Sequence, residues 1–120
     1  MPLTSILGLS RLAKPLTSKE GNMILQRDRY RCQYCGLDGA ASFENSLILT
    51  VDFVHPRAKK GKKDPANLVT SCRPCNVIKG HHVFATVDDA RKYVLERRAA
   101  LHKDWELRLA RLHLPETVAK

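Results

Sequence analysis

The sequence has few aromatic residues and no long hydrophobic run, and both absences narrow the possible functions. Aromatic residues make up 6% of the 120 residues, so the stacking platforms that bind single-stranded nucleic acids are not expected. No apolar stretch approaches the ~20 residues that a membrane-spanning helix requires. With 43% hydrophobic and 28% charged residues, the composition is that of a folded protein, and the length predicts one domain.

Acidic residues are scarce relative to basic ones. The chain has 21 Lys and Arg against 12 Asp and Glu, which gives a net charge of +9 at pH 7. Such a surplus on a small protein favours a polyanionic partner. The surplus is concentrated in residues 1–80, which contain 13 basic and 6 acidic side chains, whereas residues 81–120 contain 8 and 6.

Cysteine occurs four times, in the two CxxC pairs Cys32–Cys35 and Cys72–Cys75. We identify no secretory signal peptide and expect a cytoplasmic, reducing location, where such pairs are typical metal ligands. A CxxC turn places two thiolates on one metal, and two such turns complete the tetrahedral set that zinc prefers. The 36 residues between the pairs must then contain an inserted element. The sequence therefore predicts a structural four-cysteine zinc site.

The residues around and between the cysteine pairs predict short elements. A helix capped by Thr17 is expected to end near Tyr30, and residues 39–45 are expected to form a loop. The β-branched run Leu47–Val54 predicts a strand, and Leu68–Thr70 predicts a second one. A short helix should follow the second cysteine pair and close at a glycine, Gly80.

The last third of the chain predicts one long helix from Val87 to Leu114, which Pro115 ends. Residues at helical spacing form a mainly apolar face, which is interrupted by one arginine. Such a face is typical of a helix that packs on a core or pairs with a second copy. The residues of this face are Ala90, Val94, Arg97, Leu101, Trp105, Leu109 and Leu112.

Four short motifs carry a resemblance to a known family. They are Arg31–Gly36 around the first cysteine pair, Val51–Arg57 (VDFVHPR), Asn67–Val69, and Cys75–Gly80 (CNVIKG). Together they resemble the HNH endonuclease family over residues 27–82. The resemblance implies an α+β fold, namely a small ββα-metal domain with a structural zinc site and flanking helices.

The resemblance also implies a set of functional residues. Asp52 and Asn76 would bind Mg²⁺ or Mn²⁺, and Asn67 would brace the loop that orients the catalytic histidine. Carboxylate and amide oxygens suit such hard cations. The cation stabilises charge while a general base activates water for phosphodiester hydrolysis. The implied activity is metal-dependent cleavage of DNA, and one such site would nick one strand.

One position departs from the family pattern. Family members usually have a histidine directly after the aspartate, as the general base, whereas this chain has Phe53, which cannot accept a proton. The nearest imidazole is His55, on the same strand face, ~6.5–7 Å further along. Three interpretations stay open: His55 has become the base, the site is impaired and binds or weakly nicks DNA, or Phe53 is an introduced substitution that traps an inactive form. We take His55 as the best remaining base. His81 and His82, after the last motif, are either exposed turn residues or contacts to a metal or phosphate.

The connection between the two predicted strands is strongly basic, with five Lys and Arg among the seven residues from 57 to 63. A position inside the hairpin favours contact with the phosphates of double-stranded DNA. No feature indicates base-specific readout, so we expect weak sequence preference. The residues expected to contact DNA are Arg57, Lys59, Lys60, Lys62, Lys63, Arg73 and Lys79.

These observations divide the chain into four parts. They are a lead segment (1–17), a nuclease-like domain with the zinc site (18–85), a long helix packed on that domain (86–114) and a tail (115–120). Two alternatives to a nuclease remain: a zinc-stabilised DNA-binding module without catalysis, and a structural zinc protein whose basic surface binds RNA or an acidic partner. The sequence leaves open a monomer or a homodimer.

Overall fold

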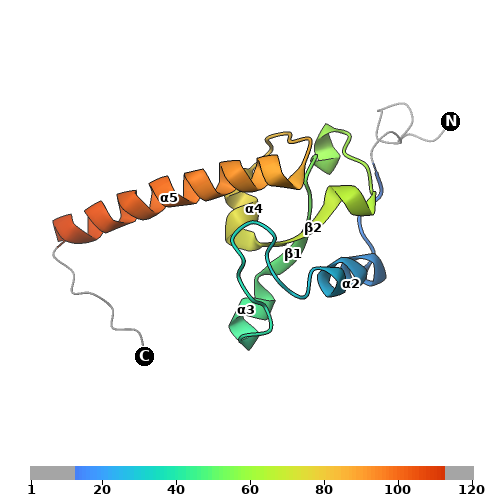
Figure 1. Ribbon diagram of the computed structural model, residues 1–120, viewed down its shortest axis with the longest axis horizontal. Coiled ribbons are helices and arrows are strands. Elements are labelled where there is room, and N and C mark those ends of the chain that lie inside the picture. Colours follow the sequence, from blue (N-terminus) through green and yellow to red (C-terminus); the bar gives the residue numbers. More distant parts are fainter. Residues whose placement is uncertain (1–12, 113–120) are drawn as a thin grey trace.

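The structure, a computed structural model, describes residues 13–112. A two-stranded sheet lies at its centre, and helices surround it (Figure 1). The predicted α+β fold with a ββα unit is confirmed, because the second strand runs directly into a helix. None of the described helices is both long and apolar enough to cross a bilayer. In chain order the helices and strands are α2 (Ser18–Arg27), α3 (Phe43–Leu47), β1 (Leu49–Phe53), β2 (Leu68–Cys72), α4 (Arg73–Lys79) and α5 (Val87–Leu112).

Residues 1–12 and 113–120 lie outside the described part of the chain. Most of the expected lead segment, the expected tail and the helix end at Pro115 fall there.

The two strands pair antiparallel, with Leu49 opposite Cys72 and Asp52 opposite Val69. Every residue of β2 is buried, because α2 contacts it on one side and α4 follows it on the other. Two short 3₁₀ turns, η2 (Arg57–Lys59) and η3 (Pro65–Asn67), lie in the connection between the strands. The hairpin is therefore short, and the connection between its strands is basic.

The expected loop over residues 39–45 is partly wrong, because α3 begins at Phe43. The hydroxyl of Ser42 accepts a hydrogen bond from the Asn45 backbone N–H and starts this helix. The helix extends to Leu47, so β1 begins two residues later than its β-branched run suggested. A serine cap outweighs strand propensity here.

Helix α2 is held against the base of the hairpin by its last residues. Its N-terminus has the reciprocal capping contacts of Thr17 and Glu20. At its C-terminal end, Asp28 accepts a hydrogen bond of 2.8 Å from the backbone N–H of Thr70 in β2. The helix ends at Arg27, three residues before the expected end near Tyr30, whose backbone has a left-handed φ of 56°.

The core is built around the cysteines rather than around a large apolar layer. Cys32, Cys72 and Cys75 are buried in one cluster with Ala90 and Val94 of α5. Small domains of this kind commonly need a metal to supplement a limited apolar core.

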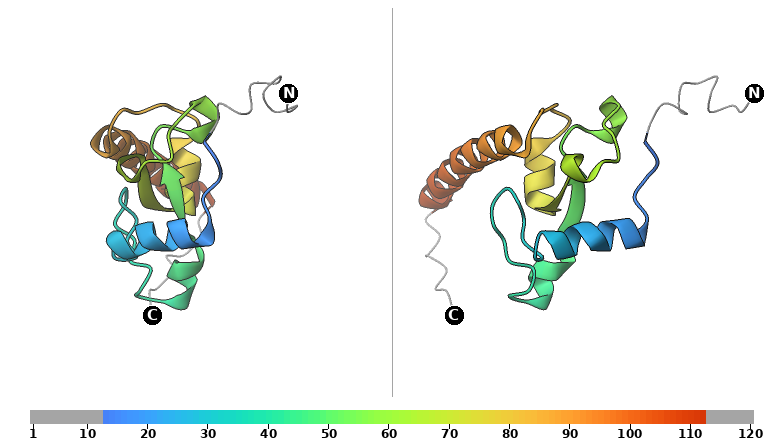
Figure 2. Two further views of the ribbon diagram at one scale, coloured as in Figure 1. Left: turned by 90° about the vertical axis from the view of Figure 1, so that its right-hand side faces the viewer. Right: turned by 45° about the vertical axis from the view of Figure 1, so that its right-hand side comes forward.

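Helix α5 buries side chains in the core only through its first turns. Ala90 and Val94 are fully buried, whereas Leu101 and Trp105 are 37% and 47% exposed. Figures 1 and 2 show the far end of α5 projecting clear of the other elements. Of the predicted apolar face, Ala90 and Val94 are therefore buried in the core, whereas Leu101 and Trp105 are exposed within the described part of the chain.

Candidate metal centre and active-site cleft

The four cysteines form one cluster, as the two CxxC pairs predicted. One sulfur from each residue lies within 4.8 Å of all the others, and the Sγ atoms of Cys35 and Cys72 are 3.7 Å apart. Four sulfurs around a tetrahedral zinc, each at ~2.3 Å, would be about 3.8 Å from one another. Backbone N–H groups of Cys35 and Cys75 point at the sulfurs of Cys32 and Cys72, at 3.4 and 3.5 Å. The cluster is compatible with a structural metal site.

The protonation of these thiols is interdependent because they are so close. A hydrogen bond from Cys75 lowers the pKa of Cys32 to about 4, and burial raises the pKa of Cys72 to about 11. More than one negative charge in this space requires a cation among the sulfurs. The one cationic side chain that contacts the cluster in the described chain is Arg98 of α5, whose Nη1 is 3.7 Å from the Cys75 sulfur.

A second polar group lies directly beside this cluster. The carboxylate of Asp52 in β1 accepts a hydrogen bond of 2.6 Å from the hydroxyl of Tyr34, which lies between the first two cysteines. The ammonium of Lys79 in α4 is 3.3 Å from the same carboxylate oxygen and donates to the backbone oxygen of Phe53 at 3.1 Å. Burial raises the pKa of Asp52, while Tyr34 and Lys79 act in the opposite direction. Burial and the neighbouring Asp52 raise the pKa of Tyr34.

Asp52 lies at one wall of a cleft of about 470 Å³ between the hairpin and α4. Asn76, from the first turns of α4, lines the same cleft, so the structure brings together the two residues that the resemblance implied as ligands of a divalent cation. A carboxylate and an amide oxygen form a donor set that fits Mg²⁺ or Mn²⁺. Arg57 borders the cleft and adds positive charge at its edge.

The cleft also contains Phe53 and His81. Phe53 adds an apolar wall where a polar residue was expected from the family pattern. His81 follows Gly80, whose φ of 62° ends α4 and turns the chain back toward β1. This turn explains why a histidine so far along the sequence reaches the cleft. In the sequence, the only indication of a role for His81 was its position directly after the last motif. An exposed turn residue could occupy the same position, so the sequence could not distinguish the two.

His55 is placed differently from Asp52. The backbone of His55 is clasped by the side chain of Asn67, which accepts from the His55 N–H at 2.8 Å and donates to the His55 oxygen at 3.1 Å. The same amide donates to the Lys62 oxygen at 2.9 Å, so Asn67 joins both ends of the basic loop. Gly61 packs so tightly on this turn that a Cβ would be 1.8 Å from the His55 oxygen.

The ring of His55 points into the basic loop. Its Nε2 is 2.7 Å from the backbone oxygen of Lys59, and the residue lines a second depression of about 370 Å³ together with Phe84. The structure therefore does not bring the His55 ring into the Asp52 cleft. His55 as the general base remains a prediction from the sequence.

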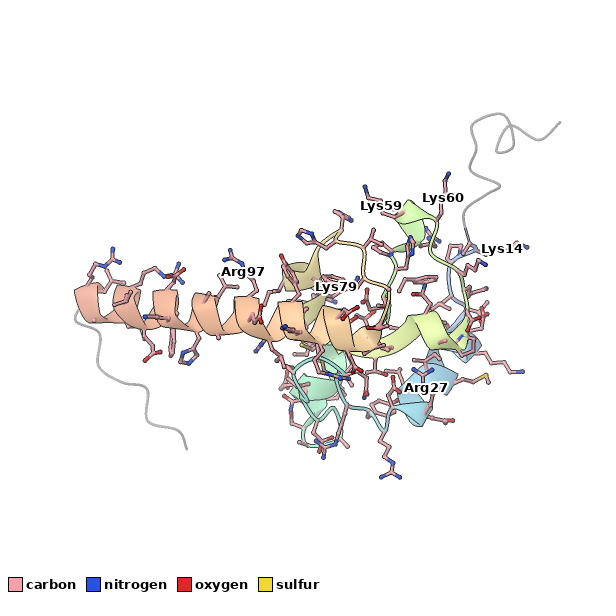
Figure 3. The ribbon with its side chains drawn as sticks, turned by 45° about the horizontal axis from the view of Figure 1, so that its top comes forward. Lys14, Arg27, Lys59, Lys60, Lys79 and Arg97 are labelled. Atoms are coloured by element: carbon pink, nitrogen blue, oxygen red, sulfur yellow. The ribbon has the colours of Figure 1, made fainter. Side chains whose placement is uncertain are left out.

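Most of the residues expected to contact DNA are accessible. Figure 3 shows Lys59 and Lys60 projecting from the loop between the strands. Lys62 and Arg73 are also exposed, and Arg57 lies at the edge of the cleft. Of these side chains, Arg57 lines the Asp52 cleft, whereas Lys60 and Lys62 line the depression that contains His55.

Two lysines of the expected DNA-contacting set have partners inside the protein. Lys79 is 1% exposed and bonded to Asp52 and Phe53, so its assignment to the exposed basic surface is wrong. Figure 3 shows it within the domain. Lys63 forms an ion pair of 3.0 Å with Glu20. This contact, together with the stronger backbone bond from Thr17, lowers the pKa of Glu20 to about 2.

Comparison with known proteins agrees with this geometry. Residues 32–82 match the family model described as HNH endonuclease. The matched region contains both cysteine pairs, the hairpin and α4, so the resemblance seen in the sequence motifs is confirmed. No curated protein and no solved structure matched the chain.

Proposed function

Taking residues 32–82 as a member of the HNH endonuclease family, we propose that the protein is a divalent-metal-dependent nuclease that hydrolyses phosphodiester bonds in double-stranded DNA. One observation carries this proposal: Asp52 and Asn76 lie in the same cleft, and an arginine borders it. One cleft per chain would cut one strand, so the expected product is a nick.

The residues that line the cleft would have different roles in hydrolysis. Asp52 and Asn76 would hold Mg²⁺ or Mn²⁺, which supplies charge stabilisation at the scissile phosphate. Arg57 would bind the phosphate from the edge of the cleft, since a guanidinium pairs with two phosphate oxygens at once. Phe53 forms an apolar wall that limits water around the reacting groups.

The general base is a histidine, and the cleft geometry favours His81. His81 lines the cleft with Asp52 and Asn76, whereas a ring nitrogen of His55 is bonded to the Lys59 oxygen in a different depression. A neutral imidazole is suited to accept a proton from water near neutral pH. His55, the base expected from the sequence, is the competing assignment, and the two assignments predict opposite results for single substitutions.

DNA would bind across the opening of the cleft. Arg57 lines the cleft, the lysines at positions 59, 60 and 62 and Arg73 are exposed, and contacts of such side chains to phosphates carry no base specificity. We therefore propose weak sequence preference and a strong dependence on salt. The four-cysteine cluster would hold structural zinc, and such free thiolate ligands fit a reducing, cytoplasmic location.

The experiment is a nicking assay on supercoiled plasmid with zinc-loaded protein and Mn²⁺ or Mg²⁺. His81→Ala should lower the nicking rate by about 100-fold or more, the usual contribution of a general base. His55→Ala should leave most of the rate, provided that the variant retains its zinc. The reverse pattern would assign the base to His55. A parent protein without metal-dependent nicking would contradict the proposed function.

A second candidate function is a DNA-binding module without catalysis, and the apolar wall formed by Phe53 in the cleft favours it. Phe53→His separates the two. If the parent retards DNA in a gel but does not nick it, and Phe53→His nicks, the present chain is a binding module with a restorable site. If the parent already nicks, the second candidate is excluded.

A further inference from the structure

Tyr34 connects the four-cysteine cluster to the cleft. It lies between Cys32 and Cys35, is 2% exposed, and donates its hydroxyl hydrogen to Asp52 at 2.6 Å. The cysteines on either side of it belong to the sulfur cluster. A metal held by those sulfurs would fix the backbone that carries Tyr34, and through the phenol it would fix the carboxylate of Asp52.

The two oxygens of Asp52 have different surroundings. Both Tyr34 and Lys79 contact Oδ2, at 2.6 and 3.3 Å. In the described residues, no buried side-chain nitrogen or oxygen lacks a hydrogen-bond partner, and Oδ1 has no such partner among them. Oδ1 is therefore accessible, and since Asp52 lines the cleft, Oδ1 is the atom that a cation there would reach.

Lys79 competes with any such cation for the carboxylate. Its ammonium is buried, and besides Asp52 it contacts the backbone oxygen of Phe53. With Oδ2 shared between a phenol and an ammonium, the carboxylate cannot turn fully toward Lys79. Without the phenol, the charge-assisted pairing with Lys79 would determine the orientation of the Asp52 carboxylate. Oδ1 would then turn away from the cleft.

We propose that Tyr34 is a positioning residue that holds Asp52 with Oδ1 directed at the cleft, so that the cysteine cluster sets the affinity of the cleft for a divalent cation. The inference rests on the proposed function only in treating Asp52 as a cation ligand. Residues that hydrogen-bond to a metal ligand commonly change metal affinity by about 10- to 100-fold, which is the size of effect expected here.

The test compares Tyr34→Phe with Tyr30→Phe. The second variant also loses a tyrosine hydroxyl, at an exposed residue near the first CxxC pair. Binding of Mn²⁺ is measured directly by electron paramagnetic resonance, and zinc content by elemental analysis. Tyr34→Phe should bind Mn²⁺ about 10- to 100-fold more weakly with the zinc content unchanged. Tyr30→Phe should bind Mn²⁺ as the parent does. Equal affinities in all three proteins would overturn the inference.

The same measurements separate this inference from the proposed function. If the parent binds Mn²⁺, Asp52→Asn does not, and the parent nicks no DNA, the nuclease proposal fails while the role of Tyr34 stands. If Asp52→Asn binds Mn²⁺ as well as the parent does, Asp52 is not the ligand, and the inference is overturned whatever the activity.

A second measurement uses the unaltered side chain, in case Tyr34→Phe loses zinc or does not fold. The ring resonances of Tyr34 are followed by NMR while Mg²⁺ is added. They should shift in a saturable manner, and the shift should be absent in Asp52→Asn. Resonances of Tyr34 that do not respond to Mg²⁺ while the Asn76 amide does would overturn the inference.

Discussion

The cysteine–hairpin region (residues 31–82) combines short helices, strands and loops, whereas distal α5 (residues 99–112) is helical throughout, and the two regions differ strongly in their contacts. In the first, side chains from distant positions converge, as when Tyr34 meets Asp52 and Arg98 meets Cys75. In the second, the contacts are local, such as the exposed pair of His102 and Glu106, one helical turn apart. The comparison shows that local pattern suffices to form a helix, whereas a site requires partners from several elements.

The largest difference between the two regions should appear when the cysteine cluster is broken. Cys72→Ser or removal of the metal by a chelator should unfold the cysteine–hairpin region, because structural zinc sites contribute on the order of 10 kcal/mol. Distal α5 depends on no such site and should lose only the support of its first turns. Near-ultraviolet and far-ultraviolet circular dichroism measure the two effects. A chain with unchanged thermal stability after zinc removal contradicts this account.

A smaller effect should distinguish two positions on one face of α5. Val94 is fully buried, whereas Leu101, on the same face two turns later, is 37% exposed. Val94→Ala should reduce the free energy of unfolding by about 2 kcal/mol, and Leu101→Ala by about 0.5 kcal/mol or less. Urea unfolding measures both. Equal losses would show that distal α5 has a packing partner in solution.

The contact of Arg98 with the sulfur cluster should be visible in the rate of zinc release. Arg98 donates to the Cys75 sulfur, whereas its neighbour Arg97 is exposed and projects from α5 (Figure 3). Arg98→Ala should release zinc to a coloured chelator about 10-fold faster than the parent. Arg97→Ala should match the parent. If both variants release zinc at the parental rate, α5 does not stabilise the cluster.

A still smaller effect concerns pH. Burial raises the pKa of Asp52, and a protonated carboxyl does not bind a divalent cation. The affinity for Mn²⁺ should therefore fall as the pH is lowered, and the fall should begin above the range in which an ordinary aspartate titrates. Binding is measured at pH values where the zinc content stays constant. An affinity independent of pH down to the ordinary aspartate range would contradict the burial of this group.

Much of the cysteine–hairpin region could be predicted because the residues that determine its structure are close together in the sequence. Each CxxC pair fixes two metal ligands in one turn, and the β-branched run before Pro56 identifies β1. The short α3 was missed because Ser42 starts it within a stretch that otherwise has the composition of a loop. These elements depend on neighbours in the sequence, which is why pattern reasoning finds or misses them one at a time.

The remaining features depend on contacts that no local pattern encodes. Lys79 resembles other basic residues in the sequence, and only the packing of α4 on β1 buries it against Asp52. His55 and His81 could not be ranked before the direction of the chain after Gly80 was known. The exposed far end of α5 was also unpredictable, because an apolar face at helical spacing does not show whether another element lies beneath it.

The most direct test of the central claim is the rate at which zinc-loaded protein nicks supercoiled plasmid in Mn²⁺, compared with Asp52→Asn in the same assay. The account predicts metal-dependent nicking by the parent and a loss of about 100-fold or more in the variant, because an amide replaces the charged cation ligand. The zinc content of the two proteins should be equal. Nicking at the same rate by both proteins, or by neither, would contradict the assignment of this cleft as a nuclease site.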